Sequence, residues 1–124
     1  MRLAIRKTDT AYSRYRRAKA KWRCERCGAQ HQENSGGLHC SHFIGRRNEA
    51  TRFDDDNTFA LCHGCHAYFT ANPYEHTAWV EKKLGAVKYK ALIVRSQFPV
   101  KRDDALTTIV IKELIKISGK THPF

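Results

Sequence analysis

Two Cys-x-x-Cys pairs constrain this 124-residue chain more than any other feature of its sequence. Cys24 and Cys27 form the first pair, and Cys62 and Cys65 form the second. Four thiolates at this paired spacing are the ligand set of a structural zinc site. The sequence therefore predicts a zinc knot that joins two distant segments, with disulfides or buried thiols as the alternatives. Cys40, the fifth cysteine, is expected to be a free buried thiol, which fits a reducing cytoplasm.

Positive charge is the second informative feature. Lysine and arginine number 23 against 12 acidic residues, so the formal net charge is +11. The excess lies in residues 1–23 and 73–124, whereas residues 24–72 are slightly acidic. Two basic segments around an acidic centre are typical of a protein that binds a polyanion beside a cation site. We therefore expect a nucleic-acid partner, the alternative being a basic protein whose charges only keep it soluble.

The chain length and the spacing of apolar residues predict one α+β domain over residues 1–124. Within it we expect a basic helical arm over 1–23, a zinc knot and core over 24–72, and a helical scaffold over 73–124. No stretch is long and apolar enough for a membrane span, and the N-terminus lacks the apolar run of a signal peptide. We therefore expect a cytoplasmic protein without a membrane partner.

Local signals predict the elements within these segments. An apolar stripe favours a helix from Thr8 or Asp9 to about Trp22. Turn residues delimit short strands over 38–44 and 58–61, and the second Cys-x-x-Cys pair should open a helix through Phe69. The expected later helices run from Pro73 to about residue 84, over 86–96, and from Asp103 or Asp104 onward, the last with an apolar face made of Leu106, Ile109, Val110, Leu114 and Ile117.

Histidine and asparagine residues placed around the cysteines need an explanation that a zinc knot does not supply. His42 lies 15 residues after Cys27, Asn57 lies five before Cys62, and His66 directly follows Cys65. This pattern resembles that of the HNH, or ββα-metal, nucleases. It is most similar to the phage NinG (Rap) recombination-nuclease family, in the stretches Ser41-His-Phe43, Arg46-Arg47, Arg52 to Asn57, Cys62-His-Gly-Cys65 and Ala71-Asn-Pro-Tyr-Glu75. The spacing also resembles the recombination endonuclease VII group of junction resolvases.

The resemblance covers residues 10 to 85 and implies a fold and an activity. The expected fold is a small zinc-stapled ββα-metal core with a basic N-terminal helix and about three C-terminal helices. The expected protein is a phage or prophage DNA endonuclease, acting in a bacterial host on recombination intermediates or other branched or double-stranded DNA. Its cofactors would be a structural Zn²⁺ and one catalytic divalent cation, Mg²⁺ or Mn²⁺, with Ni²⁺ or Zn²⁺ also tolerated.

The resemblance also implies roles for individual residues. His42 would be the general base that deprotonates the attacking water. Asn57 would hydrogen-bond the imidazole of His42, and His66 would bind the catalytic cation. The alternatives are a zinc ligand for His42, a turn cap for Asn57 and a surface position for His66.

The second ligand of the catalytic cation is less well defined. Many HNH sites carry Asp or His where this chain has Ser41, a poor metal ligand. His39, which shares a strand face with Ser41, is our first candidate. Asn72 and the run Asp54 to Asp56 are the alternatives. His63, inside the second cysteine pair, is expected to be structural or exposed.

Phosphate contacts are expected from arginines in the N-terminal helix and in the loop after His42. These are Arg14, Arg16, Arg17, Arg46, Arg47 and Arg52.

The apolar C-terminal helix could pair with a second copy to form a homodimer, or pack within the chain. The alternative function is a non-catalytic zinc-containing DNA-binding module; an RNA nuclease or toxin is a third reading.

Overall fold

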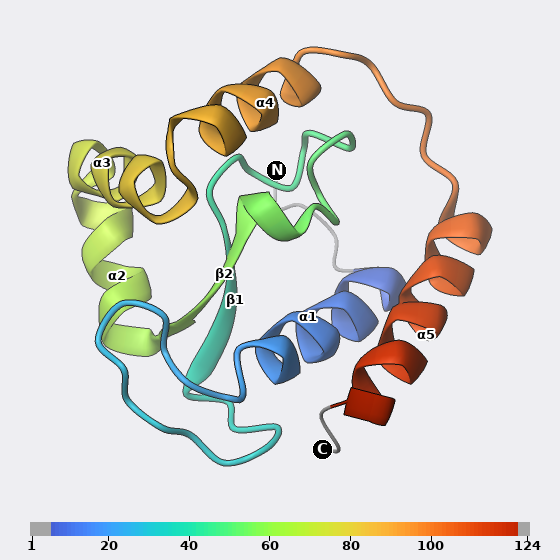
Figure 1. The fold of residues 1–124 in the computed structure, drawn as a ribbon, viewed down its shortest axis with the longest axis horizontal. Coiled ribbons are helices and arrows are strands. Elements are labelled where there is room, and N and C mark those ends of the chain that lie inside the picture. Colours follow the sequence, from blue (N-terminus) through green and yellow to red (C-terminus); the bar gives the residue numbers. More distant parts are fainter. Residues whose placement is uncertain (1–5, 122–124) are drawn as a thin grey trace.

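The computed structural model describes residues 6–121, with side chains up to residue 116. This part of the chain is a small mixed α+β structure of five α-helices and a two-stranded antiparallel sheet (Figure 1). In chain order the elements are α1 (Lys7–Lys19), β1 (Leu38–His42), the 3-10 turn η1 (Asp55–Asn57), β2 (Thr58–Cys62), α2 (His63–Ala71), α3 (Pro73–Leu84), α4 (Ala86–Ser96) and α5 (Asp104–Thr121).

Helix α1 ends three residues earlier than the sequence predicts. Lys21 and Trp22 adopt positive φ angles of 57° and 58°, which reverse the chain after the helix. The reversal lets Trp22 pack into the main core, where only 7% of its surface is exposed. Tyr12 and Tyr15 of α1 are buried against the sheet and α5. The N-terminal helix is therefore packed on the core through Tyr12 and Tyr15, and Trp22 follows it into the core.

The hairpin of β1 and β2 lies at the centre of the molecule (Figure 1). Its register places Leu38 opposite Cys62 and His42 opposite Thr58. Because strand residues alternate between faces, Cys40, His42 and Thr58 share one face and His39, Ser41 and Phe59 share the other. The first face meets α1, since Tyr12 Oη lies 2.7 Å from Thr58 Oγ1. The second face meets α2 and α3, since the ring of Phe59 packs edge-on against Trp79.

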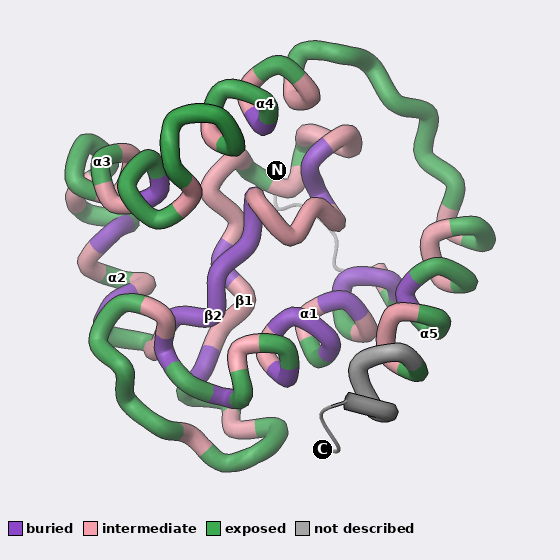
Figure 2. Tube along the Cα trace, in the orientation of Figure 1, coloured by how far each residue is buried: buried purple, intermediate pink, exposed green. Residues whose placement is uncertain are grey.

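Helices α2 and α3 cover the second face of the hairpin, and α4 packs against α3 and η1. β2 is the most buried strand, as Figure 2 shows, and Phe59 and Leu61 pack there with Phe69 of α2 and Val80 of α3. Helix α3 begins with Pro73 and ends at Gly85, whose φ of 84° suits glycine. Among residues 6–121 there is no helix whose length and apolar character would let it span a bilayer.

Helix α5 returns across the molecule to pack beside α1 (Figure 1). It buries Ile111, which is 1% exposed, against Tyr12 and Tyr15. Leu106, Ile109 and Val110 are exposed instead. Most of the described part of the apolar face expected from the sequence therefore points to solvent, although Leu114, one of its members, does contact this cluster. The side chain of Ile117 lies outside the described part.

Candidate metal centres and the His42 pocket

The four cysteines of the two Cys-x-x-Cys pairs meet at one point. Their Sγ atoms all lie within 4.8 Å of one another, and those of Cys27 and Cys62 are 3.8 Å apart. Sulfurs bound tetrahedrally to one zinc at about 2.3 Å would lie about 3.8 Å apart. All five cysteines are free thiols, so the disulfide alternative is not adopted. The cluster could bind a structural metal such as zinc, as the sequence predicts.

Backbone amides point at the sulfurs within each Cys-x-x-Cys turn. The N–H of Cys27 donates to Cys24 Sγ at 3.5 Å, and that of Cys65 donates to Cys62 Sγ at 3.4 Å. Burial alone would raise the pKa of Cys24, but backbone N–H groups stabilise its thiolate and lower the pKa to about 6. We call residues 24–27 the first knuckle and residues 62–65 the second knuckle. In both, a backbone N–H donates to a cysteine sulfur, a contact that orients and stabilises a thiolate ligand.

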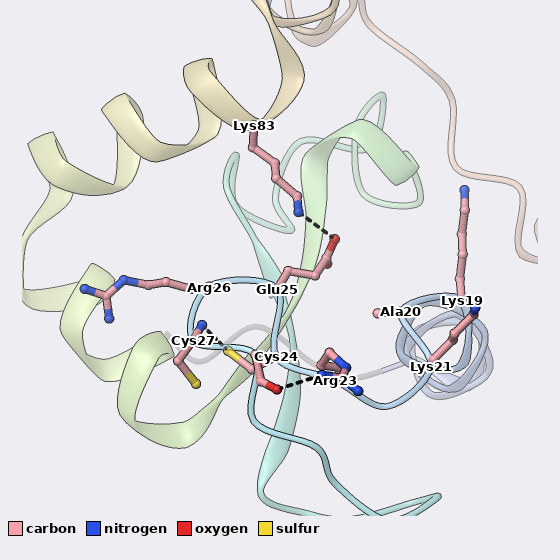
Figure 3. A pocket seen from close by; sticks show the side chains of 10 residues that line it. Lys19, Ala20, Lys21, Arg23, Cys24, Glu25, Arg26, Cys27 and Lys83 are labelled. Atoms are coloured by element: carbon pink, nitrogen blue, oxygen red, sulfur yellow. Dashed lines mark hydrogen bonds and ion pairs between the residues drawn. The ribbon is translucent and has the colours of Figure 1, made fainter.

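A cationic pocket of about 490 Å³ lies beside the first knuckle. Figure 3 shows its lining side chains, including Lys19, Lys21 and Arg23. Glu25 pairs with Lys83 across it at 3.9 Å. Arg26 extends toward α2, where its guanidinium lies 4.3 Å from the ring centre of Tyr68 and donates to Cys65 Sγ at 3.4 Å.

Three histidines gather where β1 meets the start of α2, and we call them the imidazole cluster. They are His39 of β1 with His63 and His66 of α2. The Nδ1 atoms of His39 and His66 are 2.9 Å apart, so one of these nitrogens accepts while the other donates. Burial lowers the pKa of both residues, and repulsion from neighbouring histidines adds to the shift. His39 and His66 therefore lie together, as their predicted role as ligands requires.

His42 lies in a different environment, on the α1 side of the sheet. Its Nε2 is 2.8 Å from the carbonyl oxygen of Arg52, so Nε2 carries the proton and donates it. Burial and the positive charges of Arg46 and Arg52 lower the pKa of His42. The ring is therefore a neutral imidazole at neutral pH, with its acceptor lone pair on Nδ1.

An open pocket of about 240 Å³ surrounds this imidazole, and we call it the His42 pocket. Its lining combines cationic, hydroxyl, thiol and carboxylate groups from α1, β1 and the following loop. These are Asp9, Thr10, Ser13, Arg17, Cys40, His42 and Arg46. Two arginines beside a neutral imidazole are suited to hold an anion next to a base.

The structure does not bring His42 together with the imidazole cluster. His39 and His42 are three residues apart on β1, so their side chains leave opposite faces of the strand. His39 contacts α2, whereas His42 faces the α1 residues of its pocket. The resemblance implies that His42 acts beside a cation bound by His66 and His39, but the structure places these residues on opposite faces of β1.

Asn57 also differs from the expectation. Its Oδ1 accepts from the Ile44 amide at 2.7 Å, and its Nδ2 donates to the carbonyls of Ile44 and Thr51 at 2.9 and 3.0 Å. The prediction that Asn57 hydrogen-bonds the His42 ring is therefore wrong, because Arg52 provides that contact. Asn57, fully buried, instead fixes the loop over residues 44–51 that leads to Arg52.

The alternative second ligands make other contacts. Asn72 Nδ2 donates to the Tyr68 carbonyl at 2.8 Å at the junction of α2 and α3. Asp54 and Asp56 pair with Arg95 of α4 at 2.8 and 3.3 Å. Asp55 accepts from the hydroxyls of Tyr12 and Tyr15 and pairs with Lys19. His39 is the candidate that the structure places against His66.

The six arginines expected to contact DNA fall into three groups by burial. Arg16 is 7% exposed and binds Glu25 and the Thr58 carbonyl, while Arg52 is 4% exposed and forms a two-pronged ion pair with Asp9. The prediction that these two lie on a DNA-facing surface is wrong, because their charges neutralise buried carboxylates. Arg17 is half-buried and donates to backbone carbonyls. Arg46 is half-buried as well, and Arg14 and Arg47 are exposed.

His63 is the member of the imidazole cluster that was expected to be structural or exposed. Its ring centre lies 5.5 Å from that of His39. The signal was present, because His63 and His66 are three residues apart and therefore share a face of α2. Their position in and directly after a Cys-x-x-Cys pair favoured a structural reading of His63 instead.

Comparisons of the chain with family models, with curated proteins and with solved structures found no match.

Proposed function

We propose that this protein is a metal-dependent DNA endonuclease with a zinc-stapled ββα-metal core. The observation that carries the proposal is the setting of His42: a neutral imidazole, oriented by the Arg52 carbonyl, in an open pocket that also contains Arg17 and Arg46. Hydrolysis of a phosphodiester needs a base for the attacking water and positive charge for the phosphate. His42 Nδ1 would take the proton, and the arginines would hold the phosphate oxygens.

The imidazole cluster supports the metal-dependent part of the proposal. His39 and His66 present nitrogen donors 2.9 Å apart, within the spacing of about 2.9–3.4 Å expected for two ligands of one ion bound at about 2.0–2.1 Å. A divalent cation held there would stabilise negative charge on the phosphate and the leaving oxygen. The four knuckle cysteines would hold the structural zinc.

Substrate would have to contact both faces of β1. Within residues 6–121, β1 pairs with β2 alone, so its other edge forms no sheet ladder. A phosphodiester backbone lying along this edge could contact the His42 pocket on one side and the imidazole cluster on the other. Arg14 and Arg47, both exposed, would add contacts to neighbouring phosphates.

The experiment is cleavage of supercoiled plasmid and of a four-way DNA junction by wild type and His42→Ala, with Mg²⁺ or Mn²⁺ and with EDTA as a control. We expect metal-dependent cutting whose rate falls by about 10²–10⁴ in His42→Ala. DNA affinity should remain, since His42 is not a cation. His31→Ala, which removes a histidine outside both sites, should cut like wild type. Undiminished cutting by His42→Ala would contradict the role of His42.

The second candidate function is a non-catalytic, zinc-containing DNA-binding module. One observation favours it: His42 and the imidazole cluster lie on opposite faces of the hairpin. Tight binding of DNA without cutting, with every metal tested, would establish this alternative.

A further inference from the structure

We infer that the cationic pocket beside the first knuckle binds backbone phosphates of DNA, at a surface separate from the His42 pocket. We call it the first-knuckle pocket. This contact rests on the proposed function for the identity of its partner, and it adds a surface that takes no part in the chemical step. The charged residues of its lining are Lys19, Lys21, Arg23, Glu25, Arg26 and Lys83.

The single carboxylate of this lining is already neutralised from within the fold. Arg16, which is buried, donates to the two oxygens of Glu25 at 3.2 and 3.0 Å, and the amide of Ala60 donates to the same carboxylate at 2.6 Å. Lys83 approaches Glu25 only to 3.9 Å, from the α3 side of the pocket (Figure 3). The ammonium of Lys83 is therefore available to a further anion.

Lys21 and Arg23 contribute positive charge that the fold does not offset. Both side chains are exposed, and among the described residues neither pairs with a carboxylate. Arg23 donates through Nη1 to the Gly28 carbonyl at 3.4 Å, which leaves its other N–H groups for an anion. Lys19 differs, because it pairs with Asp55 at 2.6 Å. Guanidinium and ammonium groups at one open surface are suited to phosphate oxygens.

The backbone that carries Lys21 and Arg23 is held in place by hydrogen bonds. Gln30 Nε2 donates to the Lys21 carbonyl at 2.9 Å, and a β-bridge joins Arg23 to Gln30. The Lys21 amide donates to the Ala18 carbonyl at 2.8 Å, which supports the positive φ of 57° at Lys21. A non-glycine residue in this region persists only where its surroundings fix it. Cations on such a backbone lose less freedom when they bind a ligand.

The cysteine cluster accounts for another cation of the lining. Four thiolates around one zinc keep a net negative charge. Arg26 donates to Cys65 Sγ at 3.4 Å and lies over the ring of Tyr68, so its charge serves the sulfurs. Within the described part of the chain, Lys21 and Arg23 donate to no sulfur. Their charge is therefore not required by the cluster.

Helix α1 separates the two pockets. Thr10, Ser13 and Arg17 line the His42 pocket and share one side of α1, because they are three and four residues apart. Lys19 follows Arg17 by two residues, which is about 200° around a helix of 3.6 residues per turn. The first-knuckle pocket therefore meets the opposite side of α1. The two surfaces can bind different stretches of phosphodiester backbone.

The test is DNA binding by zinc-loaded, full-length protein, measured by fluorescence anisotropy of a labelled duplex at several salt concentrations. Every sample carries His42→Ala, so that the duplex stays intact. Lys21→Gln/Arg23→Gln is compared with the matched control Lys88→Gln/Lys112→Gln, which removes two exposed lysines outside both pockets. The pocket variant should bind at least about tenfold more weakly than the control near about 0.1 M salt, and the slope of log affinity against log salt should become shallower by about 0.9 for each lost phosphate contact.

Circular dichroism and zinc content check that each variant is folded and loaded. If Arg23→Gln disturbs the first knuckle, Lys21→Gln alone is compared with Lys112→Gln, since the Lys21 side chain is exposed. Equal affinity and slope in a folded pocket variant and its control would overturn the inference, as would a His42→Ala parent that does not bind DNA. Failure of the proposed function is distinguishable: wild type would cut no DNA with any metal, while the pocket variant would still bind DNA more weakly than its control.

Discussion

At the scale of single residues, the most consequential contact is the buried ion pair of Arg52 and Asp9. Both side chains are less than a tenth exposed, and Arg52 donates through Nε and a terminal nitrogen to both carboxylate oxygens. Asp9 also accepts from the backbone N–H of Arg6 at the start of α1. The pair joins α1 to the loop whose carbonyl orients His42.

We predict that Asp9→Asn lowers the free energy of unfolding by about 3–5 kcal/mol, because the charge of Arg52 stays buried without its anion. Burial opposes ionisation of Asp9, but its hydrogen bonds from Arg52 and Arg6 prevail and lower its pKa. The stabilisation is thus present above the unfolded pKa near 3.8 and is lost as pH falls through the folded value. Urea denaturation at pH 7 and at pH 3 measures both effects.

The control for this prediction is Glu33→Gln, which removes an exposed pair with Arg14 at 3.9 Å. Its effect should be within about 1 kcal/mol at neutral pH. If Asp9→Asn were as mild as Glu33→Gln, the buried pair would not be a major stabilising contact.

Residue roles were predictable from the sequence where the chemistry depends on spacing alone. The four knuckle cysteines meet as expected, because a Cys-x-x-Cys turn directs both sulfurs to one point. Arg16 and Arg52 were not predictable, because a sequence does not show which cation will face a buried carboxylate. The same limit applies to Asn57, whose partners lie on a loop without regular structure.

At the scale of elements, helix boundaries followed from local signals. Pro73 and Gly85 delimit α3 as expected, and Asp103 caps α5 by accepting from the Leu106 amide at 3.0 Å. The buried face of α5 did not follow, because apolar residues occur on several of its sides and do not define one stripe. Contact with Tyr12 and Tyr15 of α1 selects the face that contains Ile111.

Two isoleucines of α5 provide a matched test of this packing. We predict that Ile111→Ala, at a 1% exposed position, lowers the free energy of unfolding by about 2–5 kcal/mol. Ile109→Ala, at a 59% exposed position of the same helix, should change it by no more than about 0.5 kcal/mol. Urea denaturation followed by circular dichroism makes the comparison. A larger effect of Ile109→Ala would mean that α5 packs through its other face.

At the scale of the whole molecule, the two knuckles connect segments that are far apart in the sequence. The first knuckle follows α1, and the second joins β2 to α2, so a metal bound between them links α1, the hairpin and α2. The small mixed α+β architecture was predictable from the sequence. The link between the two knuckles and the start and stop signals of the helices are compatible with few arrangements of the chain. The separation of His42 from the imidazole cluster was not predictable, because it depends on which face of β1 meets α1.

The final prediction concerns the metal bound between the two knuckles. Cys27 is exposed, so Cys27→Ala removes almost no packing and any large effect must come from lost metal. We expect the variant to lose its equivalent of zinc. Since metal binding is coupled to folding, a loss of at least about 3 kcal/mol should lower Tm by about 10 °C. Metal analysis and thermal unfolding measure both quantities.

Cys40→Ala is the matched control, because Cys40 lies outside the sulfur cluster and burial raises the pKa of its thiol to about 12. A neutral thiol is a poor zinc ligand, so this variant should keep its zinc. Its Tm should change only by the small packing loss of one sulfur. Zinc retained by Cys27→Ala with an unchanged Tm would show that the knuckles do not form a structural metal site. Zinc lost from Cys40→Ala would place the metal in the core beneath α1 instead.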